Sequence, residues 1–366
     1  MKLILDFPIN SLSFGNVSVN LLRSLVGKSI NLSLFENGPT DLTAFDRLSE
    51  EFKVGISNAA KYKYYNLDRD IPTLKLWHIN GSERRITPKQ FLYTFYELDN
   101  PTFVEKKILS IQDHVFLSSP DAVEHFTKMG LDNVSYVPLG FDTDLVTTDE
   151  DIVKDKVHFI LMGKFENRKR TKEIIRLWLK KYGNDKKYLL SCCITNPFLK
   201  PEEFNAILGD ITEGKSYNNI NFLPFLKTNS EVNHLMNSAD IDLTGLSGAE
   251  GWNLPAFNCT SLGKWSIVNN HTGHKAWATE ENCLLVQPKR QVSADDGLFF
   301  VKGGPFNQGN INLFDDDEVV AAMEKGVEYY NAGKKNEKGL ELQKEFTYDK
   351  SADMILKTIE GKINIT

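Results

Sequence analysis

The sequence predicts an α/β protein made of two doubly wound domains that face each other across a cleft. Short apolar runs, typical of buried parallel strands, alternate with amphipathic segments of helical period. This alternation occurs twice, and a polar, acidic stretch at 142–156 separates the two series. The chain has 366 residues, which corresponds to roughly two domains at about 150 residues each.

The first half, residues 1–145, begins with the apolar strand Lys2–Phe7 and a loop that contains Gly15. Helices are expected at 19–26, 42–52, 103–111 and 121–130. Further strands are expected at 30–35, 73–80, 89–97, 114–119 and 134–139. These elements form the first predicted domain.

The second half restarts at 156 with the apolar strand 157–163. Helices are expected at 172–183, 203–211, 230–239, 254–262, 317–333 and 351–363. Strands are expected at 187–194, 220–225, 241–246, 265–270 and 283–288. We place the second domain at 156–345.

Composition, charge and residue spacing give no sign of general nucleic-acid binding, a membrane span or a metal site. The net charge of −6 gives no sign of general electrostatic binding to nucleic acid. No run of 18 apolar residues predicts a membrane span, and the N-terminus reads as a strand rather than a signal peptide, so we expect a cytoplasmic protein. The seven His and four Cys show no spacing typical of metal ligands.

Ligands of doubly wound sheets bind outside the carboxyl ends of the strands, so the loops there are the places to seek chemistry. The loop and helix at Ala249–Gly263 follow the apolar strand 241–246. A strand–loop–helix of this kind presents backbone N–H groups that suit a phosphate. Glu250 is better suited to hydroxyl groups than to phosphate. A plain loop with a solvated Glu250 fits the residue types equally well.

A basic stretch at Gly163–Thr171 directly follows the first strand of the second half. It carries Lys164, Arg168, Lys169 and Arg170, and cations need anions or water around them. A diphosphate would be paired by these side chains, and a solvated basic turn is the alternative. The spacing of a nucleoside-triphosphate P-loop is absent.

Two weaker candidates lie in the first half. Gly15 follows the first strand and would let backbone approach a phosphate closely, although a lone glycine by itself favours a simple turn. Glu97 follows an apolar strand and would face the cleft. A role as a helix cap is the alternative for Glu97.

The order of these motifs resembles the retaining nucleotide-sugar glycosyltransferases of family 4. That family's E-G-F-G-L-P-x-x-E stretch is similar to Glu250–Asn258, and its G-R-x-x-x-x-K-G stretch to the segment Gly163–Arg170. Residues 93–142 look like its Y-T-x-x-E…S…F…G…P-x-G-x-D series. The resemblance covers nearly the whole chain.

The resemblance implies the GT-B fold, with two Rossmann-like domains and a last segment, 346–366, that crosses back to the first domain. The donor would be a nucleoside-diphosphate sugar such as a UDP-sugar. Lys164 and Lys169 would neutralise its diphosphate, and Glu250 would bind its sugar hydroxyls. The other donor contacts implied are Gly15, Arg168, Gly251, Trp252, Asn253, Leu254 and Asn258, with Glu97 on the acceptor side.

Two positions depart from the family pattern. Asn258 stands where a Glu usually holds the nucleotide ribose, and an amide can still bond a diol. Asn253 replaces a Gly, but Asn tolerates positive φ better than most residues.

The implied reaction is a front-face displacement with retention, in which the lysines and a helix N-terminus stabilise the leaving diphosphate, so neither metal nor cofactor is needed. A non-catalytic sugar-nucleotide-binding subunit and a sugar-nucleotide epimerase of the same fold are the alternatives. The acceptor stays open among a glycan, a lipid-linked sugar, a modified DNA base and a protein, because the loops within 36–90 match no motif.

Overall fold

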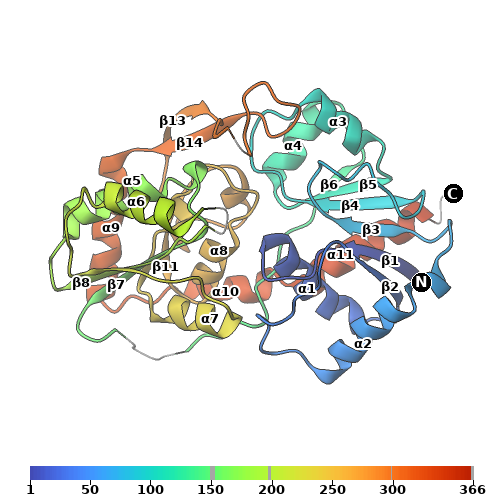
Figure 1. Cartoon of the computed structure of the whole chain (residues 1–366), viewed down its shortest axis with the longest axis horizontal. Coiled ribbons are helices and arrows are strands. Elements are labelled where there is room, and N and C mark those ends of the chain that lie inside the picture. Colours follow the sequence, from blue (N-terminus) through green and yellow to red (C-terminus); the bar gives the residue numbers. More distant parts are fainter. Residues whose placement is uncertain (149–152, 197–198, 298, 364–366) are drawn as a thin grey trace. The chain divides into compact units, whose positions relative to one another are not determined.

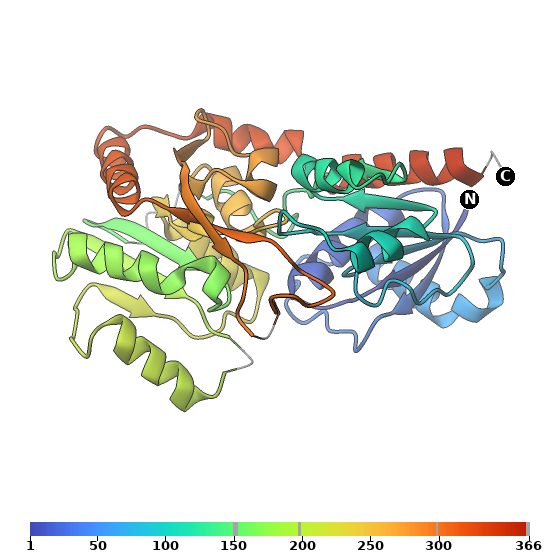
Figure 2. The same ribbon diagram turned by 90° about the horizontal axis from the view of Figure 1, so that it is seen from above.

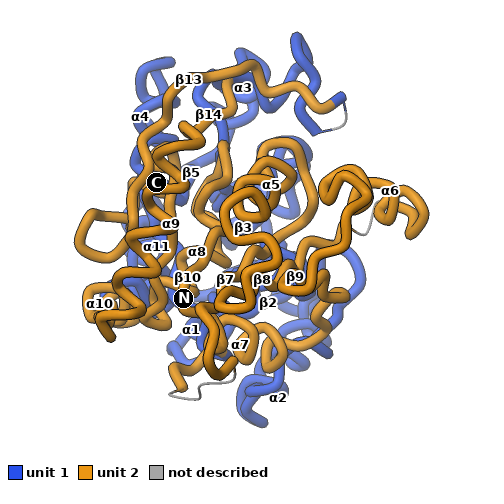
Figure 3. The backbone as a smooth tube through the Cα atoms, turned by 90° about the vertical axis from the view of Figure 1, so that its left-hand side faces the viewer, with its two compact units in different colours: residues 1–144, 297–309, 345–366 blue, residues 145–296, 310–344 orange. Residues whose placement is uncertain are grey.

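The computed structural model describes residues 1–148, 153–196, 199–297 and 299–363, which form two compact units (Figure 3). Unit 1 comprises residues 1–144, 297–309 and 345–366, and unit 2 comprises 145–296 and 310–344. The boundary at Asp144 falls inside the predicted acidic linker, of which 149–152 lie outside the described residues.

The sheet of unit 1 has six parallel strands in the order β2-β1-β3-β4-β5-β6 (Figure 1). Their bounds are β1 Lys2–Phe7, β2 Asn31–Glu36, β3 Thr73–Leu76, β4 Gln90–Thr94, β5 His114–Leu117 and β6 Val134–Tyr136. The apolar runs at β3, β4 and β5 are buried along their whole length, as expected of strands that are covered on both faces.

The helices of unit 1 are α1 Ser13–Val26, α2 Glu50–Lys61, α3 Phe103–Ser110, α4 Pro120–Lys128 and α11 Tyr348–Ile363, with the 3₁₀ turn η1 Lys63–Asn66. The chain returns to unit 1 at 345, and α11, red in Figure 2, packs on α1. At this return Gly140 lies so close to the backbone of Tyr348 that a Cβ would be 2.4 Å from its nitrogen.

Unit 2 repeats the architecture with six parallel strands in the order β12-β11-β10-β7-β8-β9. The strands are β7 Val157–Met162, β8 Tyr188–Cys193, β9 Ile220–Phe222, β10 Ile241–Asp242, β11 Trp265–Asn269 and β12 Cys283–Val286. An antiparallel pair, β13 Pro288–Ser293 and β14 Asn310–Phe314, stands apart from this sheet. The fold class predicted from the sequence, α/β with two doubly wound parallel sheets, is confirmed.

The helices of unit 2 are α5 Thr171–Tyr182, α6 Pro201–Ile211, α7 Asn229–Ser238, α8 Leu254–Ser261, α9 Asp316–Asn331 and α10 Glu337–Glu345. Short 3₁₀ turns stand at η2 Asn167–Lys169, η3 Thr244–Leu246 and η4 Thr272–Ala276. In the core, Trp178 and Tyr182 of α5 pack against Phe159 of β7, with ring centroids 6.0 and 5.5 Å from it. This packing fixes α5, and with it the loop that joins β7 to α5.

Residues 297–309, which the sequence placed in the second domain, belong to unit 1. The hydroxyl of Thr102 donates to the carbonyl of Pro305, and the N–H of Asn307 donates to the buried carboxylate of Glu105 at 2.9 Å. Gly309 lies against Asp99, where a Cβ would be 2.4 Å from Oδ1. These contacts within unit 1 are long-range in sequence, which is why the prediction was wrong here.

Two local predictions in the first half were also wrong. The helix expected at 42–52 is α2, at 50–61, because Ser49 caps it by accepting from the N–H of Phe52 and its first turn carries two glutamates. Gly15 lies not in a loop but in the first turn of α1. A Cβ there would be 2.3 Å from Oδ1 and 2.4 Å from the carbonyl oxygen of Asn10.

We therefore expect Gly15→Ala to destabilise the protein by about 1–3 kcal/mol, because a methyl group must displace the Asn10 backbone or the start of α1. The measurement is urea unfolding followed by circular dichroism. The matched control is Gly27→Ala at the end of the same helix, where nothing lies within 4 Å of the added atom and φ is −72°. Equal midpoints for Gly15→Ala and wild type would contradict this account of the glycine.

Candidate functional site

The candidate site of unit 2 is built from the loops that follow β7, β10 and β11, which are neighbours in the sheet. Because parallel strands end at the same edge, the three loops converge there. The loop after β7 carries η2, the loop after β10 leads into α8, and the loop after β11 carries η4. The two most specific sequence motifs thus belong to one site.

Glu250 is the centre of this site and is only 5% exposed. Its Oε1 accepts from Lys169 Nζ at 2.7 Å and lies 3.1 Å from Arg168 Nη1. Burial opposes ionisation of the carboxyl, but the charges of Arg168 and Lys169 outweigh it and hold the pKa of Glu250 well below its usual range. Glu250 is therefore a buried anion, and the solvated surface charge that the residue types allowed is ruled out.

The two cations that pair with Glu250 are largely enclosed as well. The side chains of Arg168 and Lys169 are 11% and 14% exposed. Arg168 Nη1 also donates to the carbonyl of Ala249 at 2.6 Å, and its Nε lies 3.0 Å from a carboxylate oxygen of Glu166. In return the N–H of Gly248 donates to the carbonyl of Arg168 at 2.7 Å. The solvated basic turn is therefore wrong for these two residues, whose backbone and side chains tie η2 to the loop after β10.

The remaining cations of the basic stretch are arranged differently. Arg170 has a left-handed φ of 57° at the start of α5, its guanidinium lies 5.5 Å from the centre of the Phe314 ring, and it pairs with Glu173 at 3.3 Å. Lys164 is half-buried directly after β7. The structure thus brings Arg168 and Lys169 onto Glu250, while Arg170 serves the start of α5.

Asn253 shapes the turn from this loop into α8. Its φ is 69°, in the left-handed region that Asn tolerates better than most residues. As N-cap of α8, its Oδ1 accepts from the N–H of Ala256 at 3.5 Å, while Nδ2 donates to the carbonyl of Thr244 and to Nε2 of His274, both at 3.0 Å. The Asn side chain thus does more than tolerate the backbone geometry: it anchors the loop from within.

The loop after β11 holds the backbone of Glu250, a contact that the sequence did not reveal. The N–H of Gly273 and the hydroxyl of Thr272 both donate to the carbonyl of Glu250 at 3.0 Å. A Cβ on Gly273 would be 2.4 Å from the carbonyl carbon of Gly251, so the two loops touch backbone to backbone. The indole N–H of Trp277 donates to the carbonyl of Trp252 at 2.9 Å.

His271 and His274 are buried beside the carboxylate and are neutral. Burial lowers the pKa of His271 to about 3, helped by His274, whose ring lies 4.8 Å away. Burial also lowers the pKa of His274, against the pull of Glu250. Because Nδ1 of His274 faces the carbonyl of Asn269 at 2.7 Å, that nitrogen carries the proton, and Nε2 is free to accept from Asn253. The histidines act as polar supports in the interior.

The other predicted residues of unit 2 lie on the same strand–loop–helix. Gly251 and Trp252 are buried in the loop, and the Trp252 ring packs on Phe257 with 5.2 Å between centroids. Leu254 begins α8, and Asn258 is buried in its second turn. The side chain of Trp252 therefore packs in the core, and only its backbone is available for a role in donor binding.

Gly15 and Glu97 lie in unit 1, whereas the Glu250 cluster lies in unit 2. Glu97 is half-buried, three residues after the end of β4. Their predicted parts in donor and acceptor binding stay predictions.

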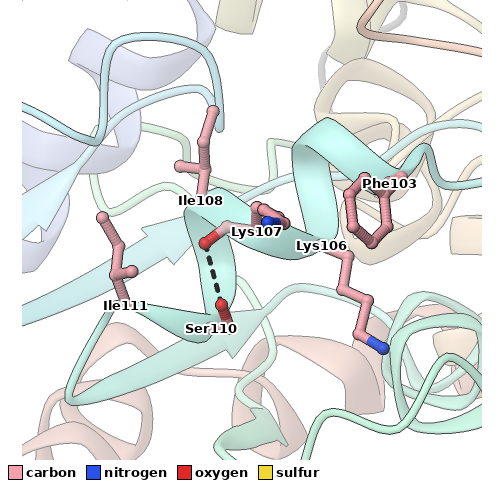
Figure 4. Close-up of a pocket in the computed structure, with 6 residues that line it drawn as sticks. All are labelled: Phe103, Lys106, Lys107, Ile108, Ser110 and Ile111. Carbon is pink, nitrogen blue, oxygen red and sulfur yellow. Dashed lines mark hydrogen bonds between the residues drawn. The ribbon is translucent and has the colours of Figure 1, made fainter.

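A hollow of about 540 Å³ lies on the surface of unit 1 along α3 (Figure 4). It is lined by Phe103, Lys106, Lys107, Ile108, Ser110 and Ile111. The Ser110 hydroxyl donates to the carbonyl of Lys107 at 2.9 Å, which satisfies one of the last carbonyl groups of α3. None of the predicted site residues lines this hollow.

Among the residues that the structure describes, no group of three or more His, Cys, Asp and Glu side chains is arranged to hold a metal ion. Within the same residues no helix is both long enough and apolar enough to cross a membrane.

Comparisons with known proteins show the fold. No family model matches the chain, and no curated protein matches it. Three solved structures are similar over 98–100% of this chain and 99–100% of their own. A sucrose-phosphate synthase from Thermosynechococcus elongatus has 12% identity and a TM-score of 0.69. HepE of Anabaena, in complex with UDP-glucose, has 14% identity and a TM-score of 0.65. A glycosyltransferase from Rickettsia africae has 12% identity and a TM-score of 0.66. The chain thus has the GT-B fold.

We expect Glu250→Gln to lower the free energy of unfolding by about 3 kcal/mol at pH 7, because it leaves the enclosed Lys169 without its anion and Arg168 with Glu166 alone. The pKa of Glu250 is held below its ordinary 4.5 in the folded protein. Its ionised form therefore stabilises the fold above that pH, and the stabilisation is lost as the pH falls further. The deficit of the variant should shrink below pH 4.5.

The measurement is urea unfolding of both proteins between pH 3 and pH 8. The control is Glu173→Gln, which removes the half-exposed partner of Arg170 and should change stability by less than about 0.5 kcal/mol. A deficit that is the same at every pH would contradict an ionised, buried Glu250.

Proposed function

We propose that this protein is a glycosyltransferase that moves a sugar from a nucleoside-diphosphate sugar, a UDP-sugar in the first instance, to an acceptor hydroxyl. The observation that carries the proposal is the buried cluster of Glu250, Arg168 and Lys169 at the carboxyl edge of the unit 2 sheet. Support comes from the fold, which HepE bound to UDP-glucose and the Rickettsia glycosyltransferase share.

The cluster has the chemistry that a sugar diphosphate needs. Two cations and a short helix N-terminus stand beside one carboxylate. In the proposed complex Lys169 and Lys164 pair the diphosphate, with Arg168 behind them, and the backbone of Gly251–Leu254 lies against it. Glu250 accepts from sugar hydroxyls while keeping its ion pairs. Asn258 bonds the ribose diol through its amide.

In the proposed reaction the acceptor hydroxyl attacks the anomeric carbon from the side that the diphosphate leaves, and its proton passes to the departing diphosphate oxygen. The bond to the acceptor oxygen forms on the face where the bond to the diphosphate breaks, so the configuration is retained. Negative charge then grows on the leaving diphosphate. Preorganised cations aimed at developing charge stabilise a transition state more than the ground state, and Lys169 is held in place for this by Glu250 at 2.7 Å. We propose that no metal ion takes part.

A non-catalytic sugar-nucleotide-binding subunit is the second candidate, and the observation that favours it is Asn258 in place of the family's Glu. A sugar-nucleotide epimerase of the same fold is a third reading. All three candidates bind a sugar nucleotide. The non-catalytic subunit would show no turnover, and the epimerase would form a different product from the transferase.

The test of the proposal is turnover of UDP-glucose with an array of acceptors, in buffer with and without EDTA. We expect transfer that EDTA leaves unchanged, and a loss in kcat of about 100-fold or more for Lys169→Ala. The control is Lys172→Ala, which removes a partly exposed lysine of α5 that pairs with Asp210 and should leave kcat unchanged. Nucleotide binding without turnover would favour the non-catalytic subunit, and loss of activity in EDTA would refute the metal-free reaction.

For Asn258 we expect a change in KM rather than in kcat. A ribose contact is made equally in the ground state and the transition state, so its loss weakens donor binding uniformly. Asn258→Ala should raise the donor KM about tenfold, with kcat within about twofold of wild type, in steady-state assays with varied UDP-glucose. An unchanged KM would show that Asn258 serves only the interior of α8.

A further inference from the structure

Unit 1 gathers aromatic side chains at the carboxyl edge of its own sheet. Phe14 lies in the first turn of α1, the helix that follows β1. Trp77 and His78 directly follow β3, and Phe95 directly follows β4. These strands are neighbours in the order β1-β3-β4. Three adjacent strands therefore each deliver aromatic rings to the edge where ligands of such sheets bind. We call Phe14, Trp77, His78 and Phe95 the aromatic quartet.

Phe14 is the hub of the quartet. Its ring lies 4.3 Å from the ring of Phe95, in a stacked arrangement, 4.3 Å from that of His78 and 6.0 Å from that of Trp77. Trp77 and His78 contact each other edge to face at 5.3 Å. Phe14 is 9% exposed, whereas Trp77 is half-buried and His78 is exposed. Phe14 and Phe95 thus back two rings that reach the surface.

Two carboxylates lie close to the quartet. Glu97 follows Phe95 by two residues, and the carboxylate of Glu83 accepts from the N–H of Gly81 beside the Trp77 indole. The nearby cation Lys75 is paired with Asp6 at 2.8 Å. Carboxylates beside aromatic rings suit a neutral molecule that has hydroxyl groups to donate.

We propose that the aromatic quartet binds a saccharide, and that this saccharide is the acceptor of the transfer reaction; the second half of this statement rests on the proposed function. A sugar ring has a face of C–H groups and a rim of hydroxyls. The negative face of an aromatic ring attracts the C–H face, and carboxylates such as that of Glu97 accept from the rim. Trp77 and His78 supply the faces, and Glu97 the acceptor oxygens.

The chain offers a direct probe of this site. Of its five tryptophans, Trp77 alone lies in unit 1, and the others, Trp178, Trp252, Trp265 and Trp277, are in unit 2 and at most 7% exposed. A ligand on the quartet should therefore change the fluorescence of Trp77. The probes are glucose, galactose, N-acetylglucosamine and their common disaccharides, titrated to about 100 mM, a range that covers millimolar affinities.

We expect at least one of these sugars to give a saturable change that disappears in Trp77→Phe. Calorimetry with the same sugar should show that Trp77→Phe keeps its affinity within a few-fold, because a ring remains. His78→Ala and Trp77→Ala should each lose about tenfold. The control is Tyr65→Ala, an 86% exposed tyrosine elsewhere in unit 1, which should bind as wild type. All variants should unfold at the wild-type urea midpoint.

The proposal would be overturned if none of the sugars changes the fluorescence of Trp77. It would also be overturned if adenosine or thymidine, but no sugar, changes this fluorescence. The two proposals fail separately. A wild-type protein that binds a sugar at Trp77 but never turns over UDP-glucose keeps the saccharide site and refutes the transferase. A wild-type protein that turns over UDP-glucose, but whose Trp77 fluorescence no sugar changes, refutes the saccharide site alone.

Discussion

A buried carboxylate between two cations is the interaction on which the candidate site depends. Glu250 can remain ionised inside unit 2 only because Lys169 and Arg168 lie 2.7 and 3.1 Å from it. The cations in turn are enclosed only because Glu250 and Glu166 neutralise them. The loop after β7, which carries the cations, and the loop after β10, which carries Glu250, are therefore each stabilised by the charge of the other. The arrangement needs both the strand β7 and the strand β10 to end at the same edge of the sheet.

Backbone contacts make this arrangement rigid. The carbonyl of Glu250 accepts hydrogen bonds from Thr272 and Gly273 of η4, and that of Trp252 accepts one from Trp277, which follows η4. Asn253 joins the loop to neutral His274. A carboxylate positioned in this way can bond a sugar without moving, which preorganises the site at the cost of enclosing several polar groups.

The sequence predicted the parts of this architecture that depend on local pattern. Apolar runs marked the strands of both sheets, and the motifs around Lys169 and Glu250 proved to share one edge of one sheet. What it missed depends on long-range contacts. The support from His274 and Gly273 crosses from one loop to another, and nothing in the segment 271–276 itself marks that partner. Residues 297–309 were misplaced for the same reason, since Glu105 and Thr102 hold them from far away in the chain.

Glycine and asparagine illustrate the same limit at single positions. Gly15 was expected in a loop, but it lies in α1, and Asn10 occupies the space that a Cβ would need. The tolerance of Asn253 for a left-handed backbone could be stated from the sequence, because it is a local property. Its bonds to Thr244 and His274 are tertiary and appeared only in the structure.

A crystal structure of the protein with UDP bound tests the central claim most directly. The account predicts that the β-phosphate lies within hydrogen-bonding distance of Lys169 Nζ and beside the backbone of Gly251–Leu254, while Glu250 keeps its contact with Arg168. A diphosphate bound away from this cluster, with Lys169 still paired to Glu250 alone, would contradict it.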